Sequence, residues 1–444
     1  MRSDRRRAAR RAQFGGLLRP AIWEYSFLGS DTEHEDVSAR EDKGLKADMS
    51  SSAGSRPEDG RHLREVGSVR IVTSMLDRER DAIAEISDQL RGADVGFLLV
   101  FASSRYQPEH LVANLDELLP GVIYAGCSTA GEIGLAGVMD SSIVAIAFPS
   151  SEYSIVCTTL DNLSEFSIEK GSELITNLRR RLPPLPEGER HNTFALTLLD
   201  GLCRQEELVL SALQRALDDI PLVGGSSGDD LTFGNTFAFV NGKALRDAGL
   251  LILISSDRPF QVFKSDHFDP TQKKLVVTAC DPAARVVSEL DAEPAALAFA
   301  EAAGIDPAAL SAMSFAAHPL LVRVGGEYYC RSIQKLHDDG SLSFYCAIDT
   351  GVVLTVARTR DMVKSLEDVL QQLDRELDGI DFVLGFDCVH RRLEAESRQV
   401  IRQVSDLFKA YRVVGFNTYG EQFNAMHLNH TFTGVAFGRR KESV

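Results

Sequence analysis

Short apolar stretches alternate with amphipathic ones along most of the chain, a pattern typical of strands that alternate with helices. The run 94–101 reads as a strand buried on both faces, because its apolar residues are nearly continuous. Amphipathic helices are predicted on either side of it, over 78–90 and 108–119. Three further strands are predicted over 69–74, 122–125 and 142–148. These elements form a first unit, and ordered structure is predicted to begin near Ser68.

The same order of elements returns twice further along the chain, which indicates an internally repeated architecture. The second unit has a predicted strand over 193–199 and a helix over 205–219. Its remaining strands are predicted over 221–223, 237–240 and 250–254. The third unit begins with a strand over 382–386, continues with a helix that runs to about Tyr411, and closes with a strand over 431–437.

Between the second and third units the pattern changes, which marks a predicted domain boundary near Leu290. The alanine-rich segment 293–310 predicts two short helices, and 362–377 predicts an amphipathic helix. Antiparallel strands are predicted over 320–324, 328–333 and 341–348, with a turn at 338–340. The predicted fold class is α/β (mixed α+β), with two domains of mixed sheets covered by helices. The predicted divisions are a disordered basic tail and linker over 1–67, domains over 68–290 and 291–438, and a tail over 439–444.

A glycine-rich motif ends in an acidic residue and recurs in each unit. It reads Gly-Cys-Ser-Thr-Ala-Gly-Glu over 126–132 and Gly-Phe-Asn-Thr-Tyr-Gly-Glu over 415–421, with a shorter copy, Gly-Gly-Ser-Ser-Gly-Asp, over 224–229. Glycines at both ends suit a loop whose backbone approaches another group closely. These loops are therefore the first candidates for ligand binding, through Ser128, Glu132, Asn417 and Glu421.

An arginine follows the leading strand of each unit by four or five residues. These residues are Arg105, Arg204 and Arg391. A guanidinium group pairs well with a carboxylate, so the three arginines are candidate partners for an anionic ligand group or for the acidic loops. The alternative interpretation is that they are solvated loop residues.

Nucleotide and nucleophile chemistry are both disfavoured by the same motifs. No lysine follows the glycine-rich loops, and the acidic residue that ends each loop would repel phosphate. Cys127 is a possible nucleophile, but Gly225 and Phe416 stand at the matching positions of the repeats. The prediction is that the protein is not an enzyme. The alternative is an enzyme that uses Cys127 or acid–base carboxylates such as Glu132 and Glu421.

Composition narrows the class of partner. The 444 residues are 44% hydrophobic and 25% charged, with a formal net charge of -16. This charge disfavours nucleic acid and anionic lipid as partners, and no apolar stretch approaches the roughly 18 residues of a membrane span. The seven cysteines form no C-x-x-C pair, which fits free thiols and a cytoplasmic location. Arginines crowd residues 1–20, but no apolar segment follows them, so export is disfavoured.

Histidines are the remaining candidates for metal or cofactor ligation. His427 and His430 follow the third glycine-rich motif, and in a regular strand their side chains would point to opposite faces. His318 precedes Pro319 at the start of the predicted antiparallel strands, and His267 and His390 lie elsewhere in the sequence.

From about Gly92 to Gly438 the chain resembles the FIST domain family, with its paired N-terminal and C-terminal domains. The residues that carry this resemblance are Phe-Ala-Ser-Ser-Arg over 101–105, the three glycine-rich motifs, and His-Leu-Asn-His-Thr over 427–431. The resemblance implies a sensory module that binds a small ligand in signalling.

Within that family, the chain resembles the standalone NosP group of haem-binding nitric oxide sensors. That resemblance implies haem b as cofactor, held without covalent attachment because no C-x-x-C-H is present. A histidine would then ligate the iron, in the order of preference His318, His427, His430, His267, with His318 and His427 as the foremost metal ligands. The implied partner is a sensor histidine kinase, a diguanylate cyclase or a phosphodiesterase, and a homo-oligomer stays open.

A second interpretation keeps a binding function but replaces haem and nitric oxide with an amino acid or similar zwitterion. Arg105, Arg204 or Arg391 would hold its carboxylate, and Glu132 or Glu421 its ammonium group. An interaction scaffold without a small ligand is a further alternative.

Overall fold

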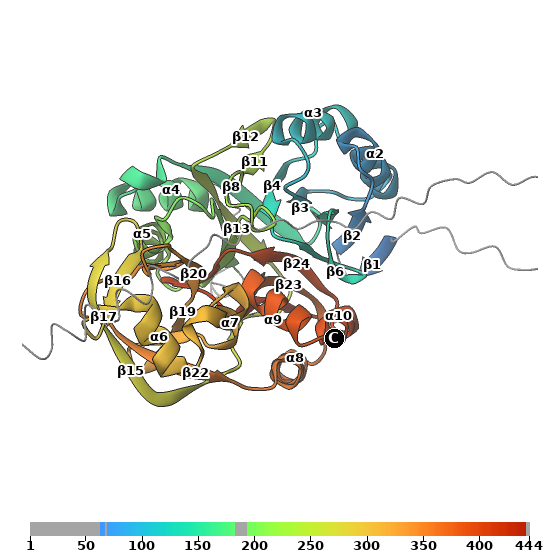
Figure 1. The fold of residues 1–444 in the computed structure, drawn as a ribbon. Helices are drawn as coiled ribbons and strands as arrows, with labels where there is room; N and C mark the ends of the chain where they lie inside the picture. Colours follow the sequence, from blue (N-terminus) through green and yellow to red (C-terminus); the bar gives the residue numbers. More distant parts are fainter. Residues whose placement is uncertain (1–62, 67–68, 183–192, 441–444) are drawn as a thin grey trace, which may run out of the picture. The chain divides into compact units, whose positions relative to one another are not determined.

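A computed structural model describes residues 63–66, 69–182 and 193–440 of the chain (Figure 1). Three sheets of the same construction form the centre of the fold, and a fourth sheet is inserted beside them. The predicted mixed α/β class is confirmed. The first strand, β1 (Leu63–Val66), lies inside the predicted tail 1–67, so ordered structure begins a few residues before Ser68. The rest of that tail lies outside the described residues, as do residues 441–444 of the tail 439–444.

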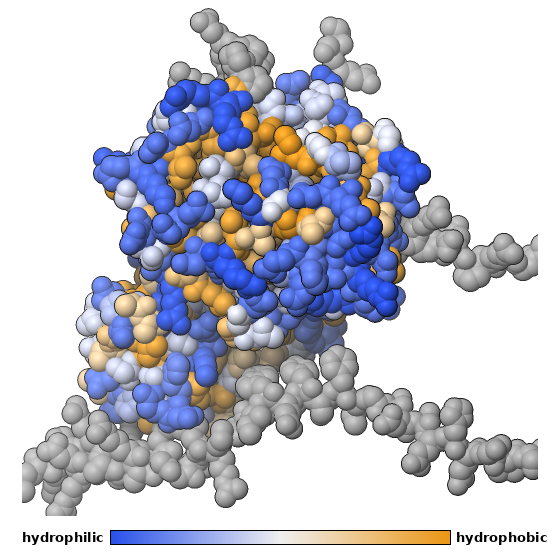
Figure 2. Space-filling view, turned by 90° about the horizontal axis from the view of Figure 1, so that it is seen from above, coloured by the Kyte–Doolittle hydropathy of each residue, from blue (hydrophilic) through white to orange (hydrophobic). Residues whose placement is uncertain are grey.

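The first sheet has seven strands in the order β1-β2-β7-β3-β4-β11-β12. After β1 these are β2 (Val69–Ser74), β7 (Ile143–Phe148), β3 (Phe97–Ser103), β4 (Tyr124–Thr129), β11 (Ala238–Val240) and β12 (Lys243–Leu245). Strands β3 and β4 are parallel, and β7 is antiparallel to β3. Helices α2 (Glu79–Leu90) and α3 (Pro108–Leu118) pack their apolar residues on one face of this sheet. In the view of Figure 2, hydrophobic residues lie between hydrophilic ones over the face shown.

The second sheet repeats this arrangement in the order β8-β13-β9-β10-β25-β26. Its strands are β8 (Tyr153–Asp161), β13 (Ala248–Ser256), β9 (Thr193–Leu199), β10 (Leu222–Ser226), β25 (Glu421–Phe423) and β26 (Met426–Leu428). A 3-10 turn, η1 (Leu163–Glu165), and helices α4 (Ile168–Arg181) and α5 (Glu206–Leu217) cover its outer face. The sequence patterns predicted β9 at its observed bounds but did not predict β8 or α4.

The third sheet has the order β14-β27-β23-β24-β5-β6. Its strands are β14 (Phe260–Ser265), β27 (Phe432–Gly438), β23 (Ile380–Cys388), β24 (Val413–Thr418), β5 (Glu132–Gly134) and β6 (Gly137–Met139). Helices α8 (Met362–Glu376), α9 (Val389–Ser397) and α10 (Ile401–Ala410) pack against it. The single helix predicted to run to about Tyr411 is therefore two helices, which meet where Gln399 adopts a positive φ of 59°.

The three units are confirmed, and the second and third are longer than predicted. Each unit begins with a strand and a helix before its central strand, namely β2 and α2, β8 and α4, and β14 and α8. The second unit therefore begins near Tyr153 rather than at 193, and the third begins near Phe260. The third unit was hard to recognise because the fourth sheet interrupts it between β14 and α8.

The fourth sheet has the order β19-β18-β22-β15-β16-β21-β20, with β17 paired to β16. Its strands are β15 (Phe268–Asp281), β16 (Val286–Leu290), β17 (Glu293–Pro294), β18 (Leu320–Val324), β19 (Glu327–Arg331), β20 (Ile333–Leu336), β21 (Leu342–Phe344) and β22 (Val353–Thr359). Three short helical segments accompany it, α6 (Ala295–Ala303), η2 (Pro307–Ala309) and α7 (Ala312–Ala317). The predicted boundary near Leu290 falls between the paired strands β16 and β17. The division into 68–290 and 291–438 stays a prediction about sequence units.

A two-stranded hairpin leaves each unit and completes the sheet of another unit. The hairpin β5–β6 of the first unit pairs with β24 of the third, and β25–β26 of the third pairs with β10 of the second. The hairpin β11–β12 of the second unit pairs with β4 of the first. The three sheets are therefore linked in a closed cycle of exchanged hairpins.

The inner faces of these three sheets share one hydrophobic core. Phe101 of β3 packs on Phe416 of β24 with ring centroids 4.7 Å apart, and on Phe386 of β23 at 6.5 Å. Leu196 and Leu198 of β9 belong to the same cluster. Because all three units contribute to this core, none of them buries its inner face alone.

The glycine-rich motifs lie mostly in strands, which corrects their prediction as loops. The leading glycine of each motif is the close-approach point: a Cβ on Gly126 would lie 1.9 Å from the carbonyl oxygen of Val100. The corresponding distances are 2.0 Å for Gly224 to Thr197 and 1.8 Å for Gly415 to Gly385. The group that these glycines approach is thus the neighbouring parallel strand of their own unit, not a ligand.

Candidate functional site

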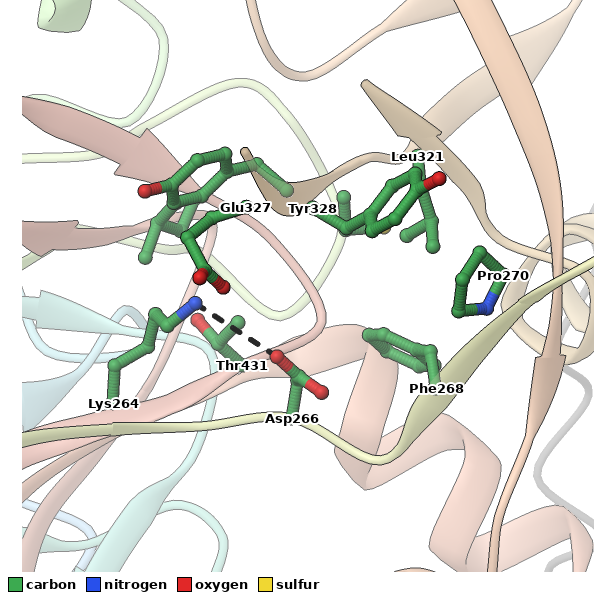
Figure 3. Close-up of a pocket in the computed structure, with 11 residues that line it drawn as sticks. Lys264, Asp266, Phe268, Pro270, Leu321, Glu327, Tyr328 and Thr431 are labelled. Atoms are coloured by element: carbon green, nitrogen blue, oxygen red, sulfur yellow. Dashed lines mark ion pairs between the residues drawn. The ribbon is translucent and has the colours of Figure 1, made fainter. Parts of the chain in front are cut away.

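A cavity of about 180 Å³ lies where the third sheet meets the fourth (Figure 3). Its walls come from β14 and β15 on one side and from β18 and β19 on the other. Pockets for drug-sized ligands have volumes of roughly 300–1,000 Å³, so this cavity suits a smaller molecule. The lining residues are Lys264, Asp266, Phe268, Pro270, Leu321, Glu327, Tyr328, Tyr329, Cys330, Leu428 and Thr431.

One end of the cavity carries charged side chains. The ammonium group of Lys264 lies 3.8 Å from the carboxylate of Asp266 and 4.8 Å from the ring centroid of Tyr329. Figure 3 shows the carboxylate of Glu327 on the same side, next to Lys264. Arg360 approaches the other oxygen of Asp266 at 3.5 Å. Since the Lys264–Asp266 contact is long, the ammonium group keeps hydrogen-bonding capacity for a further acceptor.

The other end of the cavity is apolar. Phe268, Pro270, Leu321 and the ring of Tyr328 lie together there, away from Lys264 (Figure 3). Phe268 is 7% exposed and Leu321 is 2% exposed, so these two side chains are shielded from water, whereas Pro270 is exposed and Tyr328 is half-buried. The cavity therefore offers a charged end and an apolar end to the same small molecule.

The third glycine-rich motif reaches this cavity indirectly, through Thr431. Glu421 is fully buried, and its Oε2 accepts hydrogen bonds from the hydroxyl of Thr431 at 2.7 Å and from its backbone N–H at 3.1 Å. The hydroxyl of Thr418 donates to Oε1 of the same carboxyl. Burial raises the pKa of Glu421 to about 8, against the opposing effect of these hydrogen bonds.

Glu132 repeats this arrangement in the first unit. Its carboxyl accepts from the hydroxyl of Thr129, three residues earlier, and from the hydroxyl and N–H of Ser142, ten residues later, at 2.7 and 3.0 Å. Burial raises its pKa to about 7. Both predicted ligand-binding glutamates are thus fully occupied within the fold, where they join a hairpin to its return strand.

Ser128 and Asn417, the other two motif residues predicted to bind ligand, are also fully buried. Ser128 accepts a hydrogen bond from the N–H of Phe237 at 3.0 Å. The N–H of Asn417 donates to the carbonyl of Gly131 at 2.7 Å. These contacts join each motif to the hairpin that another unit supplies, so both residues serve the exchange of hairpins.

The three loop arginines lie in different surroundings and do not pair with Glu132 or Glu421. Arg105 forms an ion pair with Asp77 at 2.9 Å and stacks on Tyr106. Arg204 is exposed and adopts a positive φ of 56°. Arg391 is buried and bonds Asp387 at 2.6 Å. The predicted common carboxylate-binding role is therefore not supported, because the structure does not bring these side chains to one place.

Arg391 instead belongs to a buried cluster with His267 and Glu394. Its Nη1 donates to Nδ1 of His267 at 2.9 Å, and Nε2 of His267 donates to Glu394 at 2.7 Å. Burial lowers the pKa of His267, so the imidazole is the neutral partner in this network. The side chain of Phe268, which lines the cavity, packs on this imidazole with ring centroids 4.6 Å apart.

His430 lies behind the same phenylalanine. Its ring is 5.5 Å from Phe268 and 4.8 Å from His390, measured between centroids, and it is fully buried. Neither ring nitrogen of His430, nor Nδ1 of His390, has a hydrogen-bond partner among the described residues. Burial lowers the pKa of His430 well below its usual value and that of His390 to about 4.

His427 and His318 occupy two further places. His427, in β26, is 2% exposed and lies near Glu206 and Cys346. His430 lies between β26 and β27 with a positive φ of 56°, so the opposite-face arrangement expected for a regular strand does not apply to this pair. His318 is half-buried at the end of α7, where its Nδ1 lies 3.1 Å from the carbonyl of Ser314. The four histidines predicted as iron ligands therefore lie in at least three separate environments.

A haem group does not fit beside three of these four histidines in this conformation. None of the four histidines lines the cavity at Lys264. His267, His427 and His430 are enclosed by packed side chains, with at most 2% of each exposed. A planar macrocycle beside any of these three imidazoles would require the core to open around it.

Cys127, the candidate nucleophile, lies in the central core. It is fully buried among apolar side chains, and burial raises the pKa of its thiol well above the usual value. A catalytic thiol needs the opposite shift.

The sequence analysis missed Lys264, Asp266 and Glu327, the charged residues of the cavity. Lys264 and Asp266 are two residues apart at the end of β14, where alternate residues share a face. That alternation was the available signal. Their approach to β19, about sixty positions later, depends on the inserted sheet and is not encoded locally.

Sequence comparison shows which known domains and proteins the chain resembles. Residues 96–293 match the sequence model of the FIST N domain, and residues 295–424 match that of the FIST C domain. The chain is also 24% identical over 398 residues to the uncharacterized protein MJ1623 of Methanocaldococcus jannaschii. The aligned region covers 80% of this chain and 76% of that protein. Among the described helices, none is long and apolar enough to cross a membrane.

Proposed function

The chain belongs to the FIST domain family, whose domains are associated with signal transduction and small-ligand sensing, and on that premise we propose that it senses a small zwitterion. An α-amino acid with an apolar side chain is the ligand class that the cavity suits best. The observation that carries this proposal is the division of the cavity into a charged end and an apolar end.

The charged end offers both signs of charge to a zwitterion. Lys264 supplies donors for a carboxylate, and Asp266 and Glu327 supply acceptors for an ammonium group. These three side chains bring one positive and two negative charges, so a ligand that is itself neutral overall adds no net charge to the cavity. A side chain on the ligand would then contact Phe268, Pro270 and Leu321, where burial of apolar area contributes affinity.

Ligand occupancy has a direct route to the rest of the fold. Thr431 lines the cavity and begins the connection to β27, while Leu428 lines it from β26. These two strands belong to different sheets. A ligand that contacts both residues can therefore favour one relative position of the second and third sheets over another. A sensor needs a structural change of this kind that depends on its ligand.

Thermal unfolding across a panel of amino acids tests this proposal. A ligand at about 100 times its dissociation constant stabilises a protein by about 2.7 kcal/mol, which raises the melting temperature measurably. We expect apolar or aromatic amino acids to raise it and their decarboxylated amines to have no effect. Lys264→Met, which keeps the aliphatic stem, should abolish the shift.

The matched control is Lys274→Met, because Lys274 is exposed on the neighbouring strand β15 and does not line the cavity. It should leave the ligand-induced shift unchanged. The proposal fails if no amino acid at millimolar concentration shifts the wild-type protein, or if the Lys264→Met variant responds as the wild type does.

The finer prediction, a haem-based nitric oxide sensor, needs its own test. The unpartnered nitrogens of His430 favour some ligand for buried imidazole, but the packing around them disfavours haem. Haem supplies an iron that binds nitric oxide when one axial position is open. Protein isolated from haem-replete cells should then show a histidine-type Soret band that nitric oxide moves. A spectrum of adsorbed free haem, unchanged by alanine at His318, His427, His430 or His267, would remove this version.

The partner predicted with it is a histidine kinase, a diguanylate cyclase or a phosphodiesterase. This prediction rests on family resemblance, and its test is reconstitution of the chain with such an enzyme. Ligand-dependent change in the activity of that enzyme is the expected result.

A further inference from the structure

Three side chains that can bind a metal ion meet beside β26 of the second sheet, and none of them lines the cavity at Lys264. Glu207 lies in the first turn of α5, Cys346 follows β21, and His427 lies in β26. One ligand atom from each of them lies within 4.8 Å of the others. The three residues come from the second unit, the inserted sheet and the third unit, so no local pattern in the chain indicates that they meet.

The surroundings of His427 indicate that one partner is missing. The residue is 2% exposed, and its Nδ1 has no hydrogen-bond partner among the described residues. Its Nε2 lies 3.9 Å from Glu206, beyond hydrogen-bonding distance. Buried polar atoms are nearly always satisfied, and leaving one unsatisfied costs roughly 1–3 kcal/mol.

The ring of His427 also packs directly against the last glycine of the third motif. A Cβ on Gly420 would lie 2.2 Å from Cε1 and 2.6 Å from Nε2 of this imidazole. Any side chain at position 420 would therefore clash with this ring, and glycine leaves the space that the ring occupies.

The other two side chains are oriented by hydrogen bonds. The thiol of Cys346 donates to Oδ1 of Asn429 at 2.9 Å. Oε1 of Glu207 accepts from the N–H of Ala347 at 2.6 Å, and its Oε2 accepts from Arg285 at 2.7 Å. Such outer contacts aim side chains at a common point, as they do around metal ligands.

From this geometry we propose that Glu207, Cys346 and His427 bind a zinc ion. A thiolate, an imidazole and a carboxylate form a mixed set that suits zinc and disfavours magnesium and calcium, which prefer oxygen ligands. Zinc bonds of about 2.0–2.3 Å place ligand atoms roughly 3.3–3.8 Å apart, so the side chains close by about 1 Å on binding. Glu206 or a water molecule supplies the fourth position.

The charges around the site favour a cation. With the thiol ionised, Glu206, Glu207 and Cys346 carry three negative charges, and Arg285, which bonds both carboxylates at 2.7 Å, carries one positive charge. Arg331 also acts electrostatically on the thiol, so the negative charges still outnumber the positive ones. Zinc binding displaces the thiol proton to solvent, so about one proton is released for each ion bound. The side chain of Glu207 is 27% exposed, which gives the ion a way in.

Binding of cobalt(II) to the chelator-treated full chain tests the proposal. Cobalt serves as a coloured substitute for zinc, and we expect one equivalent to produce a thiolate charge-transfer band that one equivalent of zinc then removes. Cys346→Ser should abolish the band, and Glu207→Gln and His427→Ala should each weaken zinc binding about 100-fold or more. Cys280→Ser is the matched control, because Cys280 is a partly exposed thiol outside the site, and it should keep the band.

Melting temperatures of the metal-free variants separate loss of binding from loss of folding. Cys346→Ser retains a hydroxyl that can donate to Asn429, so its metal-free form should melt close to the metal-free wild type. Absence of a thiolate band in the wild type would overturn the proposal. So would an undiminished band in the folded Cys346→Ser protein.

Discussion

Glu421 accepts a hydrogen bond from the hydroxyl of Thr431 at 2.7 Å, and Thr431 lines the cavity at Lys264. The glutamate that ends the third glycine-rich motif therefore supports the candidate site from behind rather than from within. The same residue is fully buried and its pKa is raised to about 8. Its protonation state therefore affects the stability of the fold and the hydrogen bonds that hold Thr431 in the cavity wall.

Glu421→Gln should weaken the pH dependence of stability on the alkaline side. The folded pKa of about 8 lies above the unfolded value of about 4.5, so the folded state holds the proton more tightly. This stabilisation is complete below the unfolded pKa and is lost as pH rises through about 8. Urea midpoints from about pH 6 to about pH 9 should fall less in the variant than in the wild type. Glu301→Gln, at an exposed position on α6, is the control, and equal slopes in all three proteins would contradict the assignment.

His390→Phe should reduce the loss of stability in mild acid. Burial lowers the pKa of His390 to about 4, below the usual value of about 6.5, so the unfolded chain takes up the proton first as pH falls. The contribution of the neutral imidazole is present above about pH 6.5 and is lost on the way down to about pH 4. The melting temperature of the variant should drop less than that of the wild type between about pH 7 and about pH 5. His110→Phe, at an exposed histidine, should behave like the wild type.

Gly415→Ala should destabilise the fold severely, by at least about 3 kcal/mol. The added methyl would lie 1.8 Å from the carbonyl oxygen of Gly385, and neither backbone can move without breaking the parallel pairing of β23 and β24. Gly234→Ala offers the comparison, since its nearest neighbour would lie 3.9 Å away. Urea denaturation measures both, and a loss for Gly415→Ala no larger than that for Gly234→Ala would show that the strands tolerate the methyl.

Asp381→Ala should cost more stability than Glu117→Ala. Asp381 bonds the buried Arg258 at 3.0 Å, and its removal leaves that guanidinium with Glu152 alone, at 2.7 Å. Breaking a buried pair costs about 3–5 kcal/mol, and the remaining carboxylate should hold the loss at the lower end of this range. Glu117 pairs with Arg80 on the surface, where such contacts contribute about 0–1 kcal/mol. Equal losses in chemical denaturation would argue against a role for the buried pair.

Cys127 should react with a thiol reagent far more slowly than a model thiol. It is fully buried and its pKa is raised, whereas Cys203 and Cys280 are partly exposed. Peptide mapping after brief labelling of the native protein should find reagent on Cys280 before Cys127. Rapid and selective labelling of Cys127 would instead revive the enzyme hypothesis.

The fold was largely predictable because many of its strands coincide with short runs of mostly apolar residues in the sequence. The strands at 69–74 and 193–199 have their predicted bounds, and both are almost entirely buried. The motif residues 126–129 were assigned to a loop because glycine, serine and threonine disfavour strands. They form part of β4, because only glycine permits the close approach of β3 at that point.

The candidate site was much less predictable, because its residues meet only through tertiary pairing. Lys264 and Glu327 lie on opposite sides of a cavity whose walls belong to two sheets. Glu132 and Glu421 were predicted to bind ligand because the motif that contains them recurs. Both recur because they form the same structural hydrogen bonds: each carboxyl accepts from a hydroxyl three residues before it and from another ten residues after it. In this chain the repeated residues maintain the architecture, and the proposed binding cavity lies where the repeat is interrupted.

The cyclic exchange of hairpins has a consequence for synthesis on the ribosome. Strand β10 receives its neighbour β25 only after residue 423 has emerged, nearly two hundred residues later. The hairpin β5–β6 likewise waits for β24. Pairing over such separations is slow, and edges left open in the meantime invite aggregation. A nascent chain of this protein must therefore stay incomplete in its second and third sheets until its last quarter is made, and a truncated product would leave unpaired edges that quality control can recognise.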